Sequence, residues 1–266
     1  AIVRLSDDEA KNKNLYDTGQ AHYTKPLDFD DVEASKLASR EDMRIDQIMC
    51  VYYYVMNMSK APFDDPLIRK AFNMAIDKER LTEHILRAFQ VPATHLLPDM
   101  YQGTLGFVPP DGPAFNPAGA RALLAEAGYP GGVGLPKIEL IYNTYETHRQ
   151  IAEFFQRNIK ENLGIEVAVQ NMEWKSLLKQ VHGGGFQISR TSWCADYPDP
   201  MTFLDVFHSE SENNYPGYKN PAYDDLLARI ARERDVRRRN LLLCAADKVL
   251  TEDMPVLPFY FYSRAY

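Results

Sequence analysis

Apolar and aromatic residues fill both phases of an alternating pattern over residues 46–59, DQIMCVYYYVMNMS. Odd positions 51, 53 and 55 carry Val, Tyr and Val, and even positions 52, 54 and 56 carry Tyr, Tyr and Met. A strand with apolar side chains on both sides is typical of a sheet that is covered on each face. The pattern therefore predicts a central strand here.

A strand, a helix and a second strand follow one another closely between residues 137 and 172. KIELIYN alternates as a strand does, YETHRQIAEFFQRNIKENLG has helical spacing and ends at Gly164, and IEVAVQNM is the second strand. Short connections of this kind predict an α/β unit with a parallel strand pair.

Helix boundaries are marked by capping residues. Asp65 before Pro66 and Asn116 before Pro117 each place an N-cap residue ahead of a proline at the first helical position. Gly128 ends the second of these helices. Further on, we expect a short helix at 173–185, a strand at 186–193, helices at 221–235 and 236–253, and a terminal strand at 254–266. The simplest architecture is one compact α/β body.

Charge and hydropathy exclude two classes of protein. The net charge is −7, and the basic run at 234–239 is interspersed with acidic residues, so we interpret it as a solvated helix face and expect no nucleic-acid partner. No apolar run has the roughly 18 residues that a membrane span requires. The first residues also lack the layout of a signal peptide, so any export signal is expected to lie outside this sequence.

The chain offers no convincing catalytic set. HGGG at 182–185 is similar to a lipase oxyanion motif, but a G-x-S-x-G nucleophile is absent and the glycines are expected to end a helix. The acidic residues near 196–210 lack the spacing of an EF-hand, and the histidines do not pair at i, i+4. We therefore expect no metal, no cofactor and no enzyme activity, and a hydrolase acting on peptides or esters is the alternative.

Aromatic residues make up 12% of the chain, including 16 tyrosines, and they suit the recognition of varied ligands. We expect most rings in VYYYV and FYFY to be core. Trp193 and Asp196 are expected just past the end of a strand, where α/β sheets place ligands. Three cysteines, Cys50, Cys194 and Cys244, allow one disulfide or none.

Several of these segments together resemble a known family. CVYYYVMN, YNTYETHRQIAE, NMEWKSLLKQ, SRTSWCADYPDPMTFLDVF and MPVLPFYFY occur in the same order as in the oligopeptide-binding proteins of bacterial ABC importers, which are solute-binding proteins of family 5, the peptide/nickel class. The resemblance implies a type II periplasmic-binding-protein-like lobe, with a central mixed β-sheet flanked by helices. Family members have two lobes, and we expect residues 1–266 to form only the C-terminal one.

The resemblance also assigns roles to residues. It implies a disulfide between Cys50 and Cys194, with Cys244 a buried apolar side chain, and it makes Asp196 the partner of the peptide's α-ammonium group. The other implied contacts are two aromatic pocket walls, two basic groups near the peptide's carboxylate, and one of two tyrosines: Trp174 and Trp193, Arg190 and His148, and Tyr260 or Tyr262. The chain departs from the family's pattern at Val55 and Val181, and a further basic position could be His84 or Arg87.

The function implied by the resemblance is the capture of short peptides between two lobes and their delivery to the transmembrane subunits of an ABC permease. The protein would be a monomer located in the periplasm, or outside the membrane as an anchored lipoprotein. A dipeptide, a murein peptide or a metal chelate are alternative ligands.

Overall fold

The central strand of the sheet is β1 (Ile45–Met56), as its alternating pattern predicts. The computed structural model describes residues 9–22, 40–101, 108 and 110–265. The sheet has six strands in the order β2-β6-β1-β5-β3-β4. The other strands are β2 (Val91–Pro92), β3 (Ile138–Asn143), β4 (Val167–Met172), β5 (Ile188–Cys194) and β6 (Val256–Ala265). β1 is antiparallel to β5 and β6, whereas β3 is parallel to β4 and β5, so the sheet is mixed as expected.

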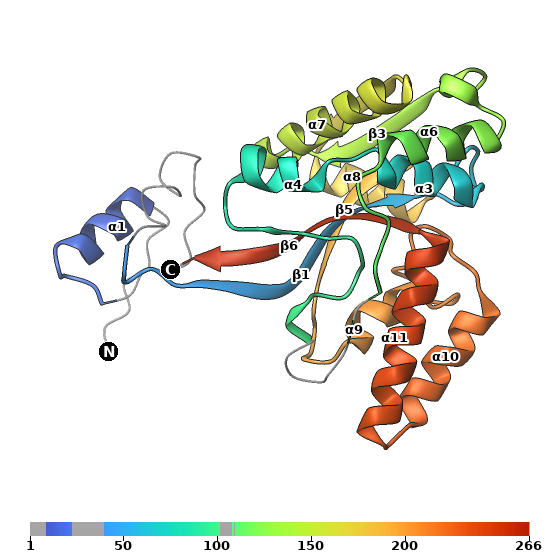
Figure 1. The fold of residues 1–266 in the computed structure, drawn as a ribbon. Coiled ribbons are helices and arrows are strands. Elements are labelled where there is room, and N and C mark those ends of the chain that lie inside the picture. The colour runs from blue at the N-terminus through green and yellow to red at the C-terminus, as the bar shows by residue number, and fades with distance from the viewer. Residues whose placement is uncertain (1–8, 23–39, 102–107, 109, 266) are drawn as a thin grey trace.

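Helices cover both faces of this sheet (Figure 1). Even-numbered β1 side chains such as Tyr52 and Tyr54 pack with α3 (Pro66–Met74), α6 (Pro117–Glu126) and α7 (Glu146–Leu163), and we call this cluster the first core. Odd-numbered side chains such as Tyr53 pack with α8 (Trp174–His182), α10 (Pro221–Arg232) and α11 (Val236–Asp253), which form the second core. The rings of the tyrosine strand are therefore core, as expected.

A β-bulge in β6 changes which face its aromatic residues occupy. Tyr52 pairs with Tyr260, but the next β1 residue pairs with Pro258, so Phe259 is an extra residue in β6. A bulge disturbs the alternation of side chains. Phe259 and Tyr260 consequently both pack in the first core, and Phe261 packs in the second.

Most predicted helix ends agree with the structure. The Asp65 side chain accepts a hydrogen bond from the Leu67 backbone N–H at 2.8 Å, and the Asn116 side chain accepts one from Gly119 at 2.9 Å. The chain after Pro66 does not form one continuous helix, however. α3 ends at Met74, and Asp77 caps a new start, α4 (Lys78–Arg80), which continues into the π-helix η1 (Leu81–Leu86).

Short helical turns complete the body: η2 (Pro130–Gly132), α9 (Met201–Leu204) and η3 (Asp205–Phe207). Among the helices that the structure describes, none is long and apolar enough to cross a bilayer.

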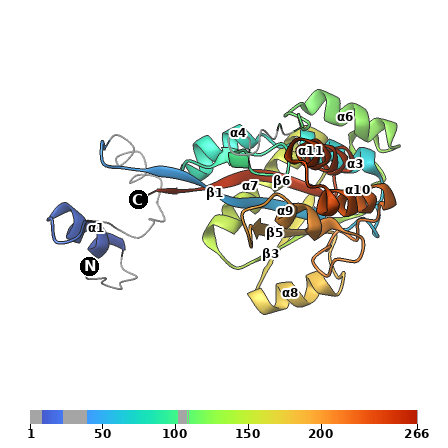
Figure 2. The same ribbon diagram turned by 90° about the horizontal axis from the view of Figure 1, so that it is seen from below.

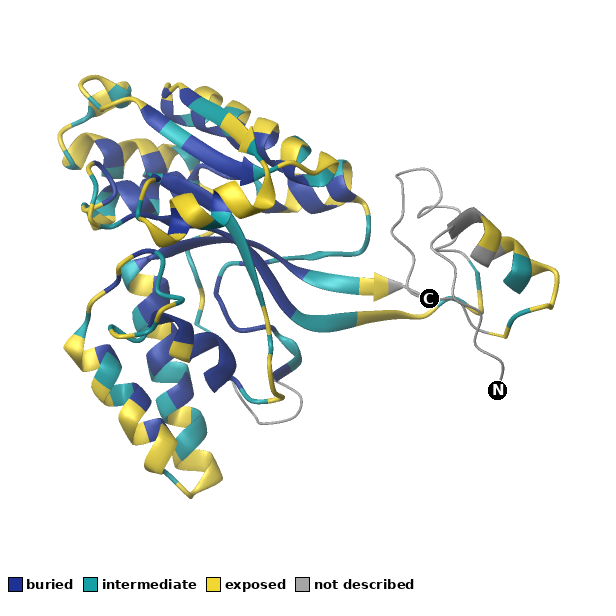
Figure 3. Ribbon diagram, turned by 180° about the vertical axis from the view of Figure 1, so that it is seen from behind, coloured by how far each residue is buried: buried dark blue, intermediate teal, exposed yellow. Residues whose placement is uncertain are grey.

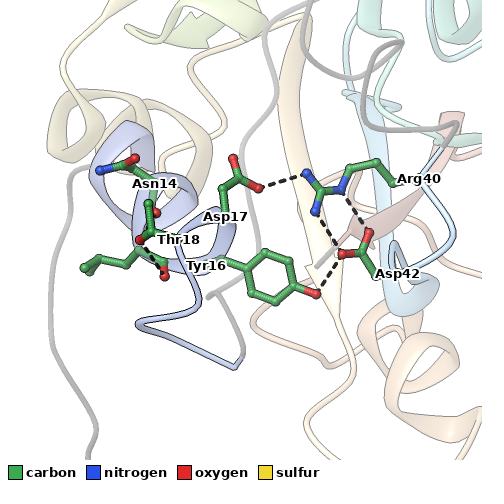
Figure 4. Close-up of polar contacts among 7 residues, drawn as sticks. Asn14, Tyr16, Asp17, Thr18, Arg40 and Asp42 are labelled. Atoms are coloured by element: carbon green, nitrogen blue, oxygen red, sulfur yellow. Dashed lines mark hydrogen bonds and ion pairs between the residues drawn. The ribbon is translucent and has the colours of Figure 1, made fainter.

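β1 and β6 extend beyond the body as a two-stranded ribbon, and the helix α1 (Glu9–Asp17) lies past its end (Figures 1 and 2). Residues of both strands change from buried to exposed along this ribbon (Figure 3). Near its end, Arg40 forms ion pairs with Asp17 at 2.9 Å and Asp42 at 2.8 Å, and the Tyr16 hydroxyl donates to Asp42 at 2.9 Å (Figure 4). These contacts tie α1 to the chain that leads into β1.

Candidate functional site

A disulfide links the two strands that carry the sequence-predicted site. Cys50 and Cys194 are register partners in the β1–β5 pair, and their sulfur atoms are bonded, with the Cα atoms 4.0 Å apart. The predicted pairing is therefore confirmed. Cys244 keeps a free thiol on α11, but it is half-buried beside the second core and not fully buried as expected.

Arg190 lies on β5 and its guanidinium group contacts the ring of Tyr52, with Cζ 5.0 Å from the ring centre. Its Nη atoms donate long hydrogen bonds to Asn143 Oδ1 at 3.4 Å and Ser192 Oγ at 3.3 Å, while Nε is buried without a partner. Within the described residues it makes no ion pair, and its neighbours are an aromatic ring and neutral polar groups, so no anionic side chain neutralises its charge. Such a guanidinium is prepared to bind an anion such as a carboxylate.

His148, on α7, belongs to the same cluster. It is buried, its Nδ1 lies 3.4 Å from the Tyr52 hydroxyl, and the two ring centres are 5.6 Å apart. Burial, reinforced by the positive charge of Arg190, lowers the pKa of His148 to about 3. The imidazole is therefore neutral at pH 7, and the positive charge expected from a pair of basic groups comes from Arg190.

The two tyrosines considered from the terminal strand have different environments. Tyr260 is buried and stacks on Tyr52, with ring centres 4.9 Å apart and planes at 12°. Tyr262 is only partly buried, and its ring meets that of Tyr260 edge to face at 5.1 Å. Of the two, Tyr262 is better placed to touch a ligand, and Tyr260 supports the ring of Tyr52.

The sequence predicts both Trp193 and Asp196 just past the end of a strand, and this is correct for Asp196 but wrong for Trp193. Trp193 is inside β5, paired with Val51, and it packs beside the second core. Since successive strand side chains alternate, it lies on the opposite face of the sheet from Arg190. Asp196 lies two residues beyond β5 with an exposed side chain, and its backbone N–H donates to Thr202 Oγ1 at 3.0 Å.

Exposed aromatic side chains stand at the carboxyl ends of β3 and β4, two parallel strands of which β3 is paired with β5. Trp174 follows β4 as the first residue of α8 and is 47% exposed. Tyr145 follows β3 and is 57% exposed, with its ring 5.2 Å from that of His148. Tyr145 is not among the site residues predicted from the sequence. The sequence feature that could have indicated it is a tyrosine at a helix N-cap, where a capping residue is usual.

Two of the features considered for hydrolase or metal chemistry, the HGGG segment and Asp199, have structural roles. His182 is the last residue of α8, and Gly183 is its C-cap, so the glycines after it end a helix as expected. Asp199 forms an ion pair with Arg239 at 2.9 Å. In the part of the chain that is described, no group of three or more His, Cys, Asp or Glu side chains could hold a metal ion.

The positions that depart from the family's pattern lie away from this cluster of polar and aromatic residues. Val55 and Val181 are both buried in the second core. His84 and Arg87, the two candidates for a further basic position, are exposed on and just after η1.

Comparison with known proteins gives consistent matches. The sequence model of the family described as bacterial extracellular solute-binding proteins, family 5 (middle part) matches residues 2–215. The chain is 39% identical over 221 residues to the periplasmic murein peptide-binding protein MppA of Escherichia coli K12, covering 80% of this chain and 40% of that protein. It is 33% identical over 264 residues to the periplasmic oligopeptide-binding protein OppA of Salmonella typhimurium LT2, covering 97% and 48%.

A solved structure shares the fold over almost the whole chain. The unliganded open form of the murein tripeptide-binding protein MppA matches with a TM-score of 0.89 and 34% identity, over 98% of this chain and 51% of that one. The chain thus spans about half the length of the relatives that it matches.

Proposed function

The chain belongs to family 5 of the bacterial extracellular solute-binding proteins, and from this premise we propose that it supplies one lobe of a receptor for short peptides. The receptor would close two lobes around the peptide and deliver it to the transmembrane subunits of an ABC importer, outside the cytoplasmic membrane. It would act as a monomer and bind without chemical change. Closure of this kind is a population shift driven by a ligand that contacts both lobes.

One observation carries the proposal: two side chains on and just beyond β5 have opposite charges and no ion-pair partner among the described residues. Arg190 has no carboxylate beside it, and Asp196 is exposed past the end of the same strand. A peptide with free ends carries one ammonium and one carboxylate group. Charge-assisted hydrogen bonds to these ends hold a peptide whatever its side chains.

The surrounding rings suit variable side chains. Trp174 and Tyr262 offer stiff, partly exposed aromatic surface with a polar tip. Water in side-chain pockets can replace tailored contacts and so permit several peptide sequences. We expect Asp196 to bind the α-ammonium group and Arg190 to lie on the side of the carboxylate.

Titration calorimetry on the protein in its full natural length tests this assignment. We expect trialanine to bind and N-acetyl-trialanine to bind at least about 10-fold more weakly, since a hydrogen bond to a charged group contributes roughly 1.5–3 kcal/mol. Asp196→Asn should weaken trialanine and leave the acetylated peptide little changed, while Asp225→Asn, on the exposed side of α10, is the matched control. Equal affinity for the two peptides, or no peptide binding at all, would contradict the proposal.

Two further measurements test the proposal, one against the hydrolase alternative and one on the role of a single lobe. Hydrolysis of a labelled peptide during the incubation would favour the hydrolase. Because the 266 residues supply one lobe in this proposal, we also expect them to bind peptide more weakly than the full-length protein does.

A further inference from the structure

β3 and β4 are adjacent parallel strands whose connections leave on opposite faces of the sheet. β3 leads into α7, which packs in the first core, and β4 leads into α8, which packs in the second core. In α/β sheets the carboxyl ends of two such strands are the preferred place for a ligand. The point between these two strand ends is therefore a candidate contact region in its own right.

Two exposed aromatic residues occupy these strand ends. Asn143 pairs with Met172 at the last rung of the ladder, and the Thr144 N–H donates to the Met172 carbonyl at 2.9 Å. Tyr145 and Trp174 each come two residues after this rung, and they are 57% and 47% exposed. The parallel register thus brings two stiff apolar surfaces to the same edge of the sheet.

Tyr145 is also an unusual choice for its position. It is the N-cap of α7, an 18-residue helix, and its side chain makes no capping hydrogen bond. The other long helices that start after residue 40 in the described chain begin at a residue whose side-chain oxygen caps the helix: Asp65, Asn116, Glu173, Asn220 and Asp235. Asn, Asp and Ser are the favoured N-cap residues, so a tyrosine at this position makes the helix less stable than one of these residues would. Such local violations are expected at functional positions.

A continuous row of contacts connects Tyr145 to the partly buried guanidinium group of Arg190. The ring centres of Tyr145 and His148 are 5.2 Å apart, and those of His148 and Tyr52 are 5.6 Å apart. The Cζ atom of Arg190 lies 5.0 Å from the ring centre of Tyr52. His148 is neutral at pH 7, because burial and Arg190 lower its pKa to about 3. An anionic group near Arg190 and a flat side chain near Tyr145 can therefore belong to one ligand, with no second cation between them.

We propose that Tyr145 and Trp174 form an aromatic pair that selects peptides carrying an aromatic side chain. The inference rests on the proposed peptide-binding function and names a preference within it. Tyr145 is the specificity-determining member, since its ring contacts that of His148 and is still 57% exposed. An aromatic side chain between the two rings gains face and edge contacts that an alanine side chain cannot make.

The test is calorimetry on the full-length protein with three peptides, Ala-Ala-Ala, Ala-Phe-Ala and Ala-Ala-Phe. We expect the wild-type protein to bind one or both phenylalanine peptides about 2- to 12-fold more tightly than trialanine. Tyr145→Asn should remove most of this preference and change trialanine affinity by less than about 2-fold, the lower end of an aromatic contribution. Tyr145→Phe should keep the preference. Phe115→Ala removes an exposed ring just before the N-cap of α6 and is the matched control.

Thermal unfolding separates this role from a structural one. Asn is a better N-cap than Tyr, so Tyr145→Asn is expected to raise Tm by roughly 2 to 4 °C while selectivity falls. A Tyr145→Asn protein that keeps the wild-type preference, or that loses affinity for all three peptides equally, overturns the inference. Failure of the wild-type protein to bind any of the peptides instead overturns the proposed function.

Discussion

Arg190 lies against the ring of Tyr52, with its guanidinium carbon 5.0 Å from the ring centre, and Tyr52 is itself stacked on Tyr260. The aromatic stack holds the arginine from one side while no carboxylate in the described part of the chain neutralises it. The same charge lies close enough to His148 to help keep that imidazole neutral. These contacts, together with others in the two cores, predict how tightly the protein binds a peptide's carboxylate. They also predict how the free energy of unfolding depends on pH and on the disulfide.

The charge of Arg190 predicts a dependence on the peptide's carboxylate. Arg190→Gln in the full-length protein should weaken trialanine by about 10-fold or more, because a charge-assisted hydrogen bond contributes roughly 1.5–3 kcal/mol. Trialanine amide, which lacks the carboxylate, should bind the wild-type protein and the variant with similar affinity. Calorimetry on the two proteins with the two peptides gives the coupling energy between Arg190 and the peptide's carboxylate. A coupling energy near zero would show that the carboxylate does not bind at Arg190.

His148 predicts a loss of stability in mild acid. The unfolded chain binds a proton on this residue below pH of about 6.5, whereas the folded protein does so only near its pKa of about 3. The contribution of His148 to the free energy of unfolding is therefore fully present above its pKa in the unfolded chain, and it decreases as the pH falls through 6 and 5. Between pH 7 and pH 5 the loss should be about 1 to 2 kcal/mol.

Urea unfolding at the two pH values measures this loss. His148→Gln should show a smaller difference between pH 7 and pH 5 than the wild-type protein, whereas His84→Gln, which changes an exposed histidine on η1, should not. An unchanged pH dependence in His148→Gln would mean that this imidazole titrates normally.

The buried Asp247 predicts that stability decreases as the pH rises, opposite to the effect of His148. It is fully buried on α11, its carboxyl oxygens lack a side-chain partner among the described residues, and burial raises its pKa to about 8. An acid with a raised pKa contributes most below the unfolded value, and stability is lost as the pH rises toward 8. Asp247→Asn should therefore stabilise the protein by about 2 to 4 kcal/mol at pH 7, and by less at pH 5.

Denaturant unfolding at both pH values checks this expectation. Asp225→Asn changes an exposed aspartate on α10 and is the control. A destabilised Asp247→Asn protein at pH 7 would show that the carboxylate has a favourable partner in the folded state.

The disulfide predicts a large effect on stability. Cys50 and Cys194 close a loop with a sequence separation of 144. Replacing both by serine should lower the free energy of unfolding by about 4 to 5 kcal/mol in the chain-entropy estimate. Guanidinium unfolding with and without reductant measures the difference. Cys244→Ser should change little, and reductant should have no further effect on the double variant.

Patterns within single segments determined much of this protein. Alternation over residues 51–56 predicted a strand covered on both faces because side chains in a strand alternate with a period of two. Capping residues such as Asp65 and Asn116 predicted helix starts because each supplies its own hydrogen-bond acceptor. The family resemblance predicted the disulfide partners correctly.

Tertiary structure alone decided which of the site residues share a surface. Arg190 and Trp193 are three residues apart, but β5 extends through both and directs them to opposite faces. Tyr145 and Trp174 lie at one edge because β3 and β4 are parallel and in register, and no local pattern specifies that pairing. The charge state of His148 likewise depends on burial beside Tyr52 and Arg190, residues distant in sequence. Alternation and capping are properties of neighbours along the chain, whereas contact, burial and charge depend on the strands and helices that packing brings together.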